Sequence, residues 1–180
     1  MNDLTDDLKY PIGNFIEPPS INKVSLQGWI NDIAAFPERL SAAVEHLSDD
    51  QLDTPYRPGG WTLRQVVHHC ADSHMNCWIR FKLALTEDKP VIKPYMEDLW
   101  AELPDSRIME IQPALTLLET LHSKWVYLLR SLSEQDLKRV YVHPQAGKEY
   151  SLDLAIALYA WHCNHHLAHI LSLKARKGWK

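Results

Sequence analysis

Four long stretches of the chain repeat apolar residues every three or four positions, the spacing that places them on one face of an α-helix. The expected helices span residues 21–46, 62–85, 113–131 and 151–177. Residues 88–111 contain three prolines and predict a long crossover, with a short helix around 96–102. The turn expected at 143–149 lies between short extended pieces. Amphipathic helices bury their apolar faces against one another, so the pattern predicts an all-α four-helix bundle with a long crossover loop.

Several residues mark where these helices should begin, bend or end. Thr62 and Gln65 have the spacing of a capping box at the start of the second helix. Ser151 is the expected cap of the fourth helix, and Gly178 its expected stop. Pro37 should kink the first helix or split it in two, because proline has no amide hydrogen.

Length and composition restrict the classes of protein to which the chain can belong. Its 180 residues predict one domain, 1–180, with 1–20 as an extended N-terminal arm. The N-terminus lacks the apolar core of a secretion signal, and no apolar run approaches the roughly 20 residues of a membrane span. The net charge of −4 gives no basic excess for nucleic acid. Three cysteines without a CxxC pair indicate reduced thiols, and hence a cytoplasmic protein.

Seven of the ten histidines fall in two short windows, 68–74 and 162–169. The fourth helix offers two pairs one turn apart, His162 with His166 and His165 with His169. Its inward face is marked by the apolar residues Ile156, Tyr159, Cys163, Ile170 and Leu173. His162 and His166 lie on that face, whereas His165 lies to one side. His162 and His166 are therefore the predicted inward pair.

A third ligand is expected from the second helix. His69 adjoins its apolar stripe, whereas His68 points about 100° away from it. Three neutral imidazoles leave open positions on Zn²⁺, which is the catalytic rather than the structural pattern. The competing interpretation is that these are buried histidines hydrogen-bonded to neighbours. Cys163 adjoins His162 but points about 100° off, so we do not expect it to bind a metal.

Lesser roles are expected for the remaining histidines. Those expected around the site, at an interface or in solvent are His68, His74, His165 and His169. Those expected at the surface or in loops are His46, His122 and His143. Arg80 follows His69 by about three helical turns on the same face and could bind an anionic group of a substrate. An ion pair at the surface or between helices is the alternative role for Arg80.

Several segments resemble the YfiT group of the DinB-like superfamily. They are LKYPIGNF, QLDTPYRPGGWTLRQVVHHCADSHMN, IRFKLALTED and WHCNHHLAHI. The resemblance covers nearly the whole chain. It implies a DinB/YfiT four-helix bundle, often a homodimer, with one divalent metal per subunit, zinc or nickel, held by three histidines. The matching positions here are His69, His162 and His166. Cys70 stands where the family is expected to carry an aliphatic residue, which should alter packing only.

The usual label of the family is metal-dependent hydrolase, and similar proteins are S-transferases that use the small thiol bacillithiol. Both activities require an open metal position and a small-molecule substrate. Asp72 and Glu149 are conceivable general bases for hydrolysis, and no glutamate lies between the two histidines of the fourth helix. A thiol that loses its proton on the metal needs no separate base, so thiol transfer is the preferred hypothesis. Hydrolysis by a metal-activated water and a non-catalytic, metal-stabilised helical dimer are the alternatives.

Overall fold

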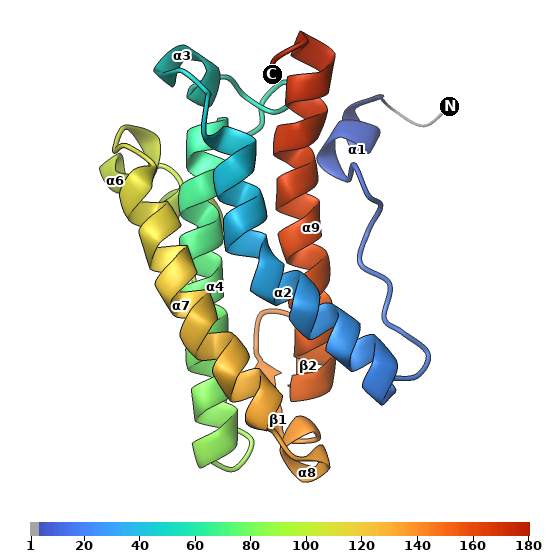
Figure 1. Ribbon diagram of the computed structural model, residues 1–180. Helices are drawn as coiled ribbons and strands as arrows, with labels where there is room; N and C mark the ends of the chain where they lie inside the picture. Colours follow the sequence, from blue (N-terminus) through green and yellow to red (C-terminus); the bar gives the residue numbers. More distant parts are fainter. Residues whose placement is uncertain (1–3) are drawn as a thin grey trace.

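The computed structural model describes residues 4–180 and contains four long helices (Figure 1). They are α2 (Lys23–Val44), α4 (Leu63–Thr86), α7 (Gln112–Ser131) and α9 (Leu152–Lys177). Helices α2 and α4 each pack against both α7 and α9, so α2 and α4 occupy opposite corners of the bundle. The predicted four-helix bundle is confirmed.

Shorter elements connect the long helices. The short helices are α1 (Leu4–Lys9), α3 (Asp49–Leu52), α5 (Glu97–Trp100), α6 (Pro104–Arg107) and α8 (Glu134–Leu137). The predicted crossover between α4 and α7 is present and carries α5 and α6. Strands β1 (Val140–His143) and β2 (Lys148–Ser151) form an antiparallel hairpin in the register Val140↔Ser151. This hairpin leads directly into α9 and, as described below, brings His143 to the site.

Two local expectations need correction, and of the two alternatives for Pro37 the structure shows the bend (Figure 1). The N-terminal arm is not extended throughout, because α1 occupies Leu4–Lys9, while residues 1–3 lie outside the described part. Pro37 does not split the first helix, since α2 runs through it and changes direction part-way along (Figure 1). Ser151 stands at the N-cap of α9, but its hydroxyl lies 2.5 Å from Asp153 Oδ1 instead of capping a backbone amide. The hydroxyl donates to the carboxylate, a charged acceptor that forms a strong hydrogen bond, and no backbone amide of α9 donates to the hydroxyl oxygen.

The capping box at the start of α4 also fixes the crossover. The Thr62 hydroxyl accepts from the backbone amide of Gln65, and the side-chain Oε1 of Gln65 accepts from the backbone amide of Thr62. The side-chain Nε2 of Gln65 donates to the carbonyl of Ala101, 2.7 Å away. Arg64 is buried beside it and donates to Asp49, Asp53 and the Met109 carbonyl. These contacts hold the crossover against the first turns of α4, the helix that carries His69.

Large apolar side chains from all four long helices fill the centre of the bundle. The largest that are fully buried include Trp125, Phe36, Phe81, Ile33, Leu118, Ile156 and Ile170. Burying one such side chain contributes about 1.5–3 kcal/mol. This apolar core fixes the rotation of α4 and α9 about their axes, and therefore the direction in which their histidines point.

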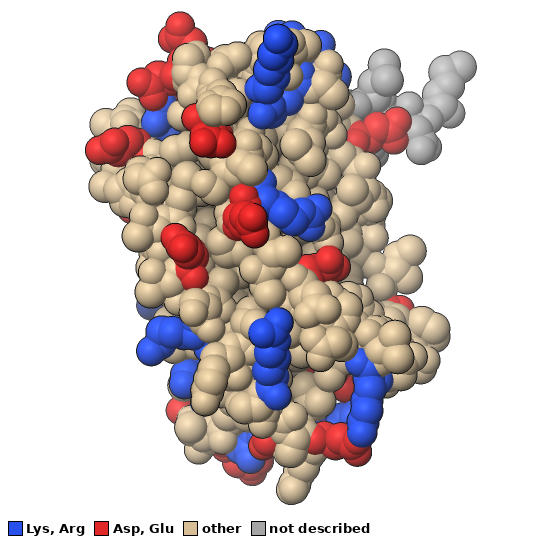
Figure 2. Space-filling view, viewed as in Figure 1, with Lys and Arg blue, Asp and Glu red and all other residues tan. Residues whose placement is uncertain are grey.

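Acidic and basic side chains are interspersed over the face seen in Figure 2. Among the described residues, no helix combines the length and the apolar character needed to cross a bilayer.

Trp125 offers a test of this packing. Its ring is fully buried with its centroid 5.6 Å from those of Phe81 and Tyr159, and its Nε1 has no hydrogen-bond partner among the described residues. Trp125→Ala should lower the free energy of unfolding by about 3–5 kcal/mol in urea titrations. Trp125→Phe should cost clearly less, because it keeps one aromatic ring, leaves a smaller cavity and removes an N–H that has no partner among the described residues. Equal losses for the two variants would contradict this account of the core.

Candidate metal centre

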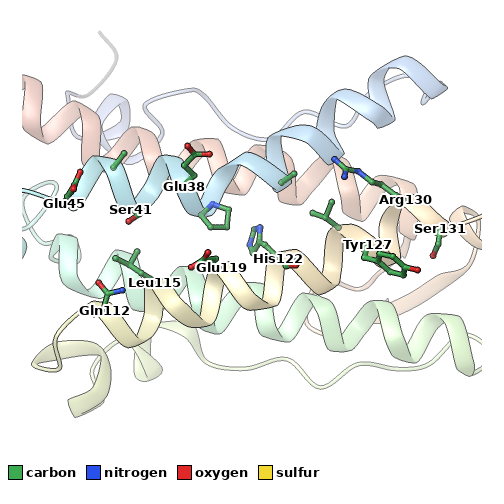
Figure 3. Close-up of a pocket in the computed structure, with 15 residues that line it drawn as sticks. Glu38, Ser41, Glu45, Gln112, Leu115, Glu119, His122, Tyr127, Arg130 and Ser131 are labelled. Atoms are coloured by element: carbon green, nitrogen blue, oxygen red, sulfur yellow. The ribbon is translucent and has the colours of Figure 1, made fainter.

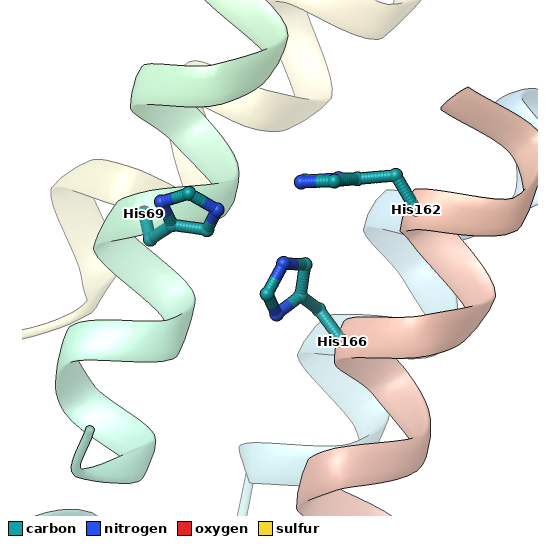
Figure 4. Close-up of side chains that lie close together, drawn as sticks. All are labelled: His69, His162 and His166. Atoms are coloured by element: carbon teal, nitrogen blue, oxygen red, sulfur yellow. The ribbon is translucent and has the colours of Figure 1, made fainter. Parts of the chain in front are cut away.

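Three imidazoles from two helices converge on one point (Figure 4). His69 comes from α4, and His162 and His166 come from successive turns of α9. One ring nitrogen from each lies within 4.8 Å of the other two. The ring centroids are 4.4 Å apart for His162 and His166, and 4.8 Å apart for His69 and His166. The three residues selected by helical phase are thus brought together.

The packing of α4 on α9 explains the convergence. Cys70 and Cys163, which are both fully buried, adjoin His69 and His162 in sequence. They hold the two helices in an orientation that turns the histidines toward the gap between them. The Trp61 ring lies against His69, with centroids 4.6 Å apart. His69 is therefore held between an aromatic wall and the two histidines of α9.

Burial keeps these imidazoles neutral. Burial and, to a smaller extent, the neighbouring His165 and His169 lower the pKa of His69 to about 3. Burial and the surrounding histidines also hold the pKa values of His162 and His166 well below the usual range. At neutral pH all three rings are uncharged, which is the form of histidine that binds metals.

The donor set suits zinc or another divalent transition metal. Three neutral imidazoles are nitrogen donors of intermediate softness, the set found in catalytic zinc sites that keep a position open. None of the thiols of Cys70, Cys77 and Cys163 belongs to a group of convergent donor atoms among the described residues. The residues present therefore fit a divalent metal with open positions.

A cavity of about 500 Å³ opens beside the three histidines. Its wall includes Arg80 from α4, Glu97 from α5 and His143 from β1, together with the apolar Trp61 and Leu158. The Arg80 side chain is buried and belongs to none of the ion pairs of the described residues. The ion-pair role considered for Arg80 is therefore not found among the described residues, and Arg80 borders the cavity.

A second group of histidine nitrogens shares one member with the first. His165, His166 and His169 also bring ring nitrogens within 4.8 Å of one another. His169 Nε2 lies 3.0 Å from the Lys9 carbonyl, which leaves only Nδ1 for any other partner. A neutral imidazole has one lone pair, so His166 can serve one metal site at a time. Because the cavity lies beside the first group, we take that group as the candidate centre.

The prediction for His122 is wrong, and the one for His143 did not foresee its place beside the site. His122 is 2% exposed and packs in the bundle interior, although it was expected at the surface. Its position on α7 matches the apolar spacing of Leu118 and Trp125, and this signal could have identified it. His143 is half-buried at the end of β1 and borders the cavity. No local pattern marks His143, because the fold of the hairpin alone brings it to the site.

The other side chains considered from the sequence lie outside the centre. His46 is exposed, as expected, and His68 lies 3.3 Å from the Met109 carbonyl. Glu149 pairs with Lys89, and Asp72 does not border the cavity, so neither conceivable base faces the histidines. The Cys163 thiol lies 4.0 Å from His74 Nε2, away from the candidate metal position. Glu97, by contrast, was missed, because only the path of the crossover places it there.

Comparison with known proteins agrees with this geometry. Residues 33–170 match the sequence profile of the DinB superfamily. The structure of YfiT from Bacillus subtilis superposes with a TM-score of 0.95 at 50% identity, over 97% of this chain and 99% of that one. The chain belongs to the YfiT group of the DinB superfamily. YfiT is described as "a probable metal-dependent hydrolase with an unusual four-helix bundle topology".

Two further relatives match this chain over nearly their full length. Proteins from Bacillus cereus and Bacillus thuringiensis subsp. konkukian are 53% identical over 174 residues, covering 97% of this chain and 99% of each relative. Both carry the name "Putative metal-dependent hydrolase". The family resemblance expected from the histidine segments is therefore confirmed across the whole bundle.

The depressed pKa values make the stability of the metal-free protein depend on pH. Burial lowers the pKa of His122 to about 4 and that of His69 to about 3, whereas an unfolded histidine titrates near 6.5. Below pH 6.5 the unfolded state therefore binds protons that the folded state does not. The resulting stability is complete above pH 6.5 and is lost as the pH falls toward the folded pKa values, at a cost of about 2 kcal/mol per such histidine at pH 5.

Urea unfolding with a chelator present, at pH 7.5 and at pH 5.0, measures this loss. Asp72 acts in the opposite direction, because burial and the nearby Asp105 raise its pKa to about 6, but one carboxyl offsets only part of the effect of several histidines. A free energy of unfolding that stays constant or rises at pH 5.0 would show that the histidines are not held neutral.

Proposed function

We propose that the protein is a metal-dependent enzyme that uses one divalent ion per subunit, zinc or alternatively nickel, held by His69, His162 and His166. The observation that carries this proposal is the convergence of three neutral imidazoles beside a cavity large enough for a small molecule. Three protein ligands leave coordination positions open to the cavity. The names of its relatives in the YfiT group support the same type of chemistry. A homodimer is the proposed assembly.

The preferred reaction is transfer of a small thiol, such as bacillithiol, to an electrophilic substrate. A divalent ion in this site would lower the pKa of a thiol or of water at its open position. Around that position the chain supplies the orientation. The Arg80 guanidinium can bind a carboxylate of the thiol, while Trp61 and Leu158 form an apolar wall for the electrophile. Arg80 favours this reaction, because a buried arginine without an ion pair is suited to an anionic ligand.

Hydrolysis is the second candidate function. It is favoured by the names of the relatives and by Glu97 and His143, two groups in the cavity wall that can accept a proton. Burial and the nearby Arg80 lower the pKa of His143, so this ring is a free base at neutral pH. The two candidates differ in a simple requirement, since thiol transfer needs the thiol and hydrolysis does not.

An assay of the zinc-loaded protein separates these reactions. With bacillithiol and a chlorinated aromatic electrophile, we expect the thioether product to form faster than without protein, and expect chelation to abolish the difference. A rate equal to the protein-free control would contradict thiol transfer. Cleavage of an ester or amide without any thiol would favour the hydrolase.

Arg80→Met tests the role of the guanidinium. It should raise KM for the thiol by about tenfold or more, the effect of losing one charge-assisted contact, and should change kcat less. Arg130→Met is the matched control, because Arg130 is exposed on α7, away from this cavity. A KM unchanged by Arg80→Met, or equally raised by both substitutions, would exclude Arg80 as the anion-binding group.

A further inference from the structure

A row of hydrogen-bonded histidines runs from the candidate metal centre across the bundle. His162 Nδ1 lies 3.1 Å from His74 Nε2, and His74 Nδ1 lies 2.7 Å from His122 Nε2. His122 Nδ1 in turn lies 2.7 Å from the carbonyl oxygen of Ile33. These four residues belong to α9, α4, α7 and α2, so this histidine row crosses all four long helices.

The far end of the row is fixed by a proline. In an α-helix the carbonyl of residue 33 would accept from the amide of residue 37. Residue 37 is proline, which has no amide hydrogen, so Pro37 leaves the Ile33 carbonyl without its intrahelical partner. His122 takes that place. A carbonyl oxygen only accepts hydrogen bonds, and the proton of His122 must therefore be on Nδ1.

The position of the proton on His122 determines the donor and acceptor nitrogens of the next two histidines in the row. A neutral His122 with its proton on Nδ1 presents a bare Nε2, so His74 must donate from Nδ1. The bare Nε2 of His74 then requires His162 to donate from Nδ1. By the same rule, His162 keeps its lone pair on Nε2. This is the ring nitrogen that remains for the gap shared with His69 and His166 (Figure 4).

A doubly protonated His74 would donate from both ring nitrogens and so reverse the hydrogen-bond directions in the row. The groups around His74 do not stabilise such a cation. His74 is fully buried, and Phe36, Trp125 and Tyr159 lie around its ring. An unpaired charge buried among such groups is costly. The Cys163 thiol, a weak donor 4.0 Å from His74 Nε2, also suits a bare nitrogen there. The Ser73 hydroxyl lies 3.4 Å from His162 Nε2 and can donate to that nitrogen while no metal is bound.

We propose that His74 and His122 are positioning residues that fix His162 in the tautomer whose Nε2 lone pair faces the metal position. The row ends on a carbonyl oxygen, which cannot pass a proton onward, so it sets a tautomer and a ring orientation. A metal on Nε2 would make Nδ1–H a stronger donor, and His74 is placed to accept from it. Loss of such a supporting hydrogen bond typically weakens metal binding 10–100-fold.

The structure also suggests where the row can be altered with least disturbance. His122 projects between α7 and α2 beside a groove of about 970 Å³ (Figure 3). A side chain of similar length can be accommodated there. His122→Gln can donate to the Ile33 carbonyl and accept from His74, whereas His122→Leu can do neither.

The first test uses the metal-free protein and is independent of the proposed function. Long-range ¹H–¹⁵N correlation spectra at pH 7.5 report which ring nitrogen of each histidine carries the proton. We expect Nδ1–H for His122, His74 and His162, although the Nε2–H form is the commoner one in free imidazole side chains. A proton on Nε2 of His162 would overturn the proposal, whatever the protein does with metals.

The second test measures zinc affinity by competition with a chelator, and this part rests on the proposed metal site. His122→Leu should weaken zinc binding 10–100-fold and shift the His162 proton toward Nε2, whereas His122→Gln should restore both to near the parent values. His46→Leu, at an exposed histidine, controls for the loss of an imidazole. If His122→Leu leaves both the zinc affinity and the tautomer of His162 unchanged, the positioning role is wrong. Failure of the unaltered protein to bind zinc would contradict the proposed function, while the spectra would still decide the tautomer.

Discussion

The structure depends on burying uncharged imidazole rings between helices, and in the described part of the chain no buried histidine forms an ion pair with a carboxylate. An interior of this kind stabilises the neutral form of histidine and disfavours the charged form. His69, His162 and His166 can share one small volume only because none of them carries a charge. The same neutrality leaves each ring with one lone pair, and a set of convergent lone pairs is what a metal ion requires. The packing of α4 on α9 and the chemistry of the site therefore have one physical cause.

The other buried histidines show how the bundle satisfies polar groups in its interior. His122, His68 and His169 each place a ring nitrogen near a backbone carbonyl, those of Ile33, Met109 and Lys9 respectively. Each carbonyl belongs to a different segment, namely α2, the crossover and α1. His68 and His169 thereby tie the crossover and α1 to α4 and α9, the helices that carry the candidate centre, and His122 ties α2 to α7. Pro37 contributes to the same arrangement, because it bends α2 and leaves one carbonyl available to His122.

The sequence predicts which side chains face the site wherever those side chains lie on a long helix. The apolar stripe of α9 separated His162 and His166 from His165, and the stripe of α4 separated His69 from His68. The same rule applied to α7 would have placed His122 inside. It fails for Glu97 and His143, because a crossover and a hairpin have no periodicity that reports their position in space. The capping contact of Ser151 was mispredicted for a related reason, since sequence spacing did not reveal that its hydroxyl donates to the carboxylate of Asp153.

X-ray absorption at the zinc edge of the loaded protein tests the central claim most directly, because it reports the atoms bound to the metal. If the three histidines hold the ion, the spectrum will show three imidazole nitrogens at about 2.0–2.1 Å and the remaining shell filled by oxygen. Substitution of His69 by alanine will remove one imidazole from that shell, whereas His68→Ala will leave it intact. A sulfur shell near about 2.3 Å, or the same shell in both variants, would contradict the site described for this bundle.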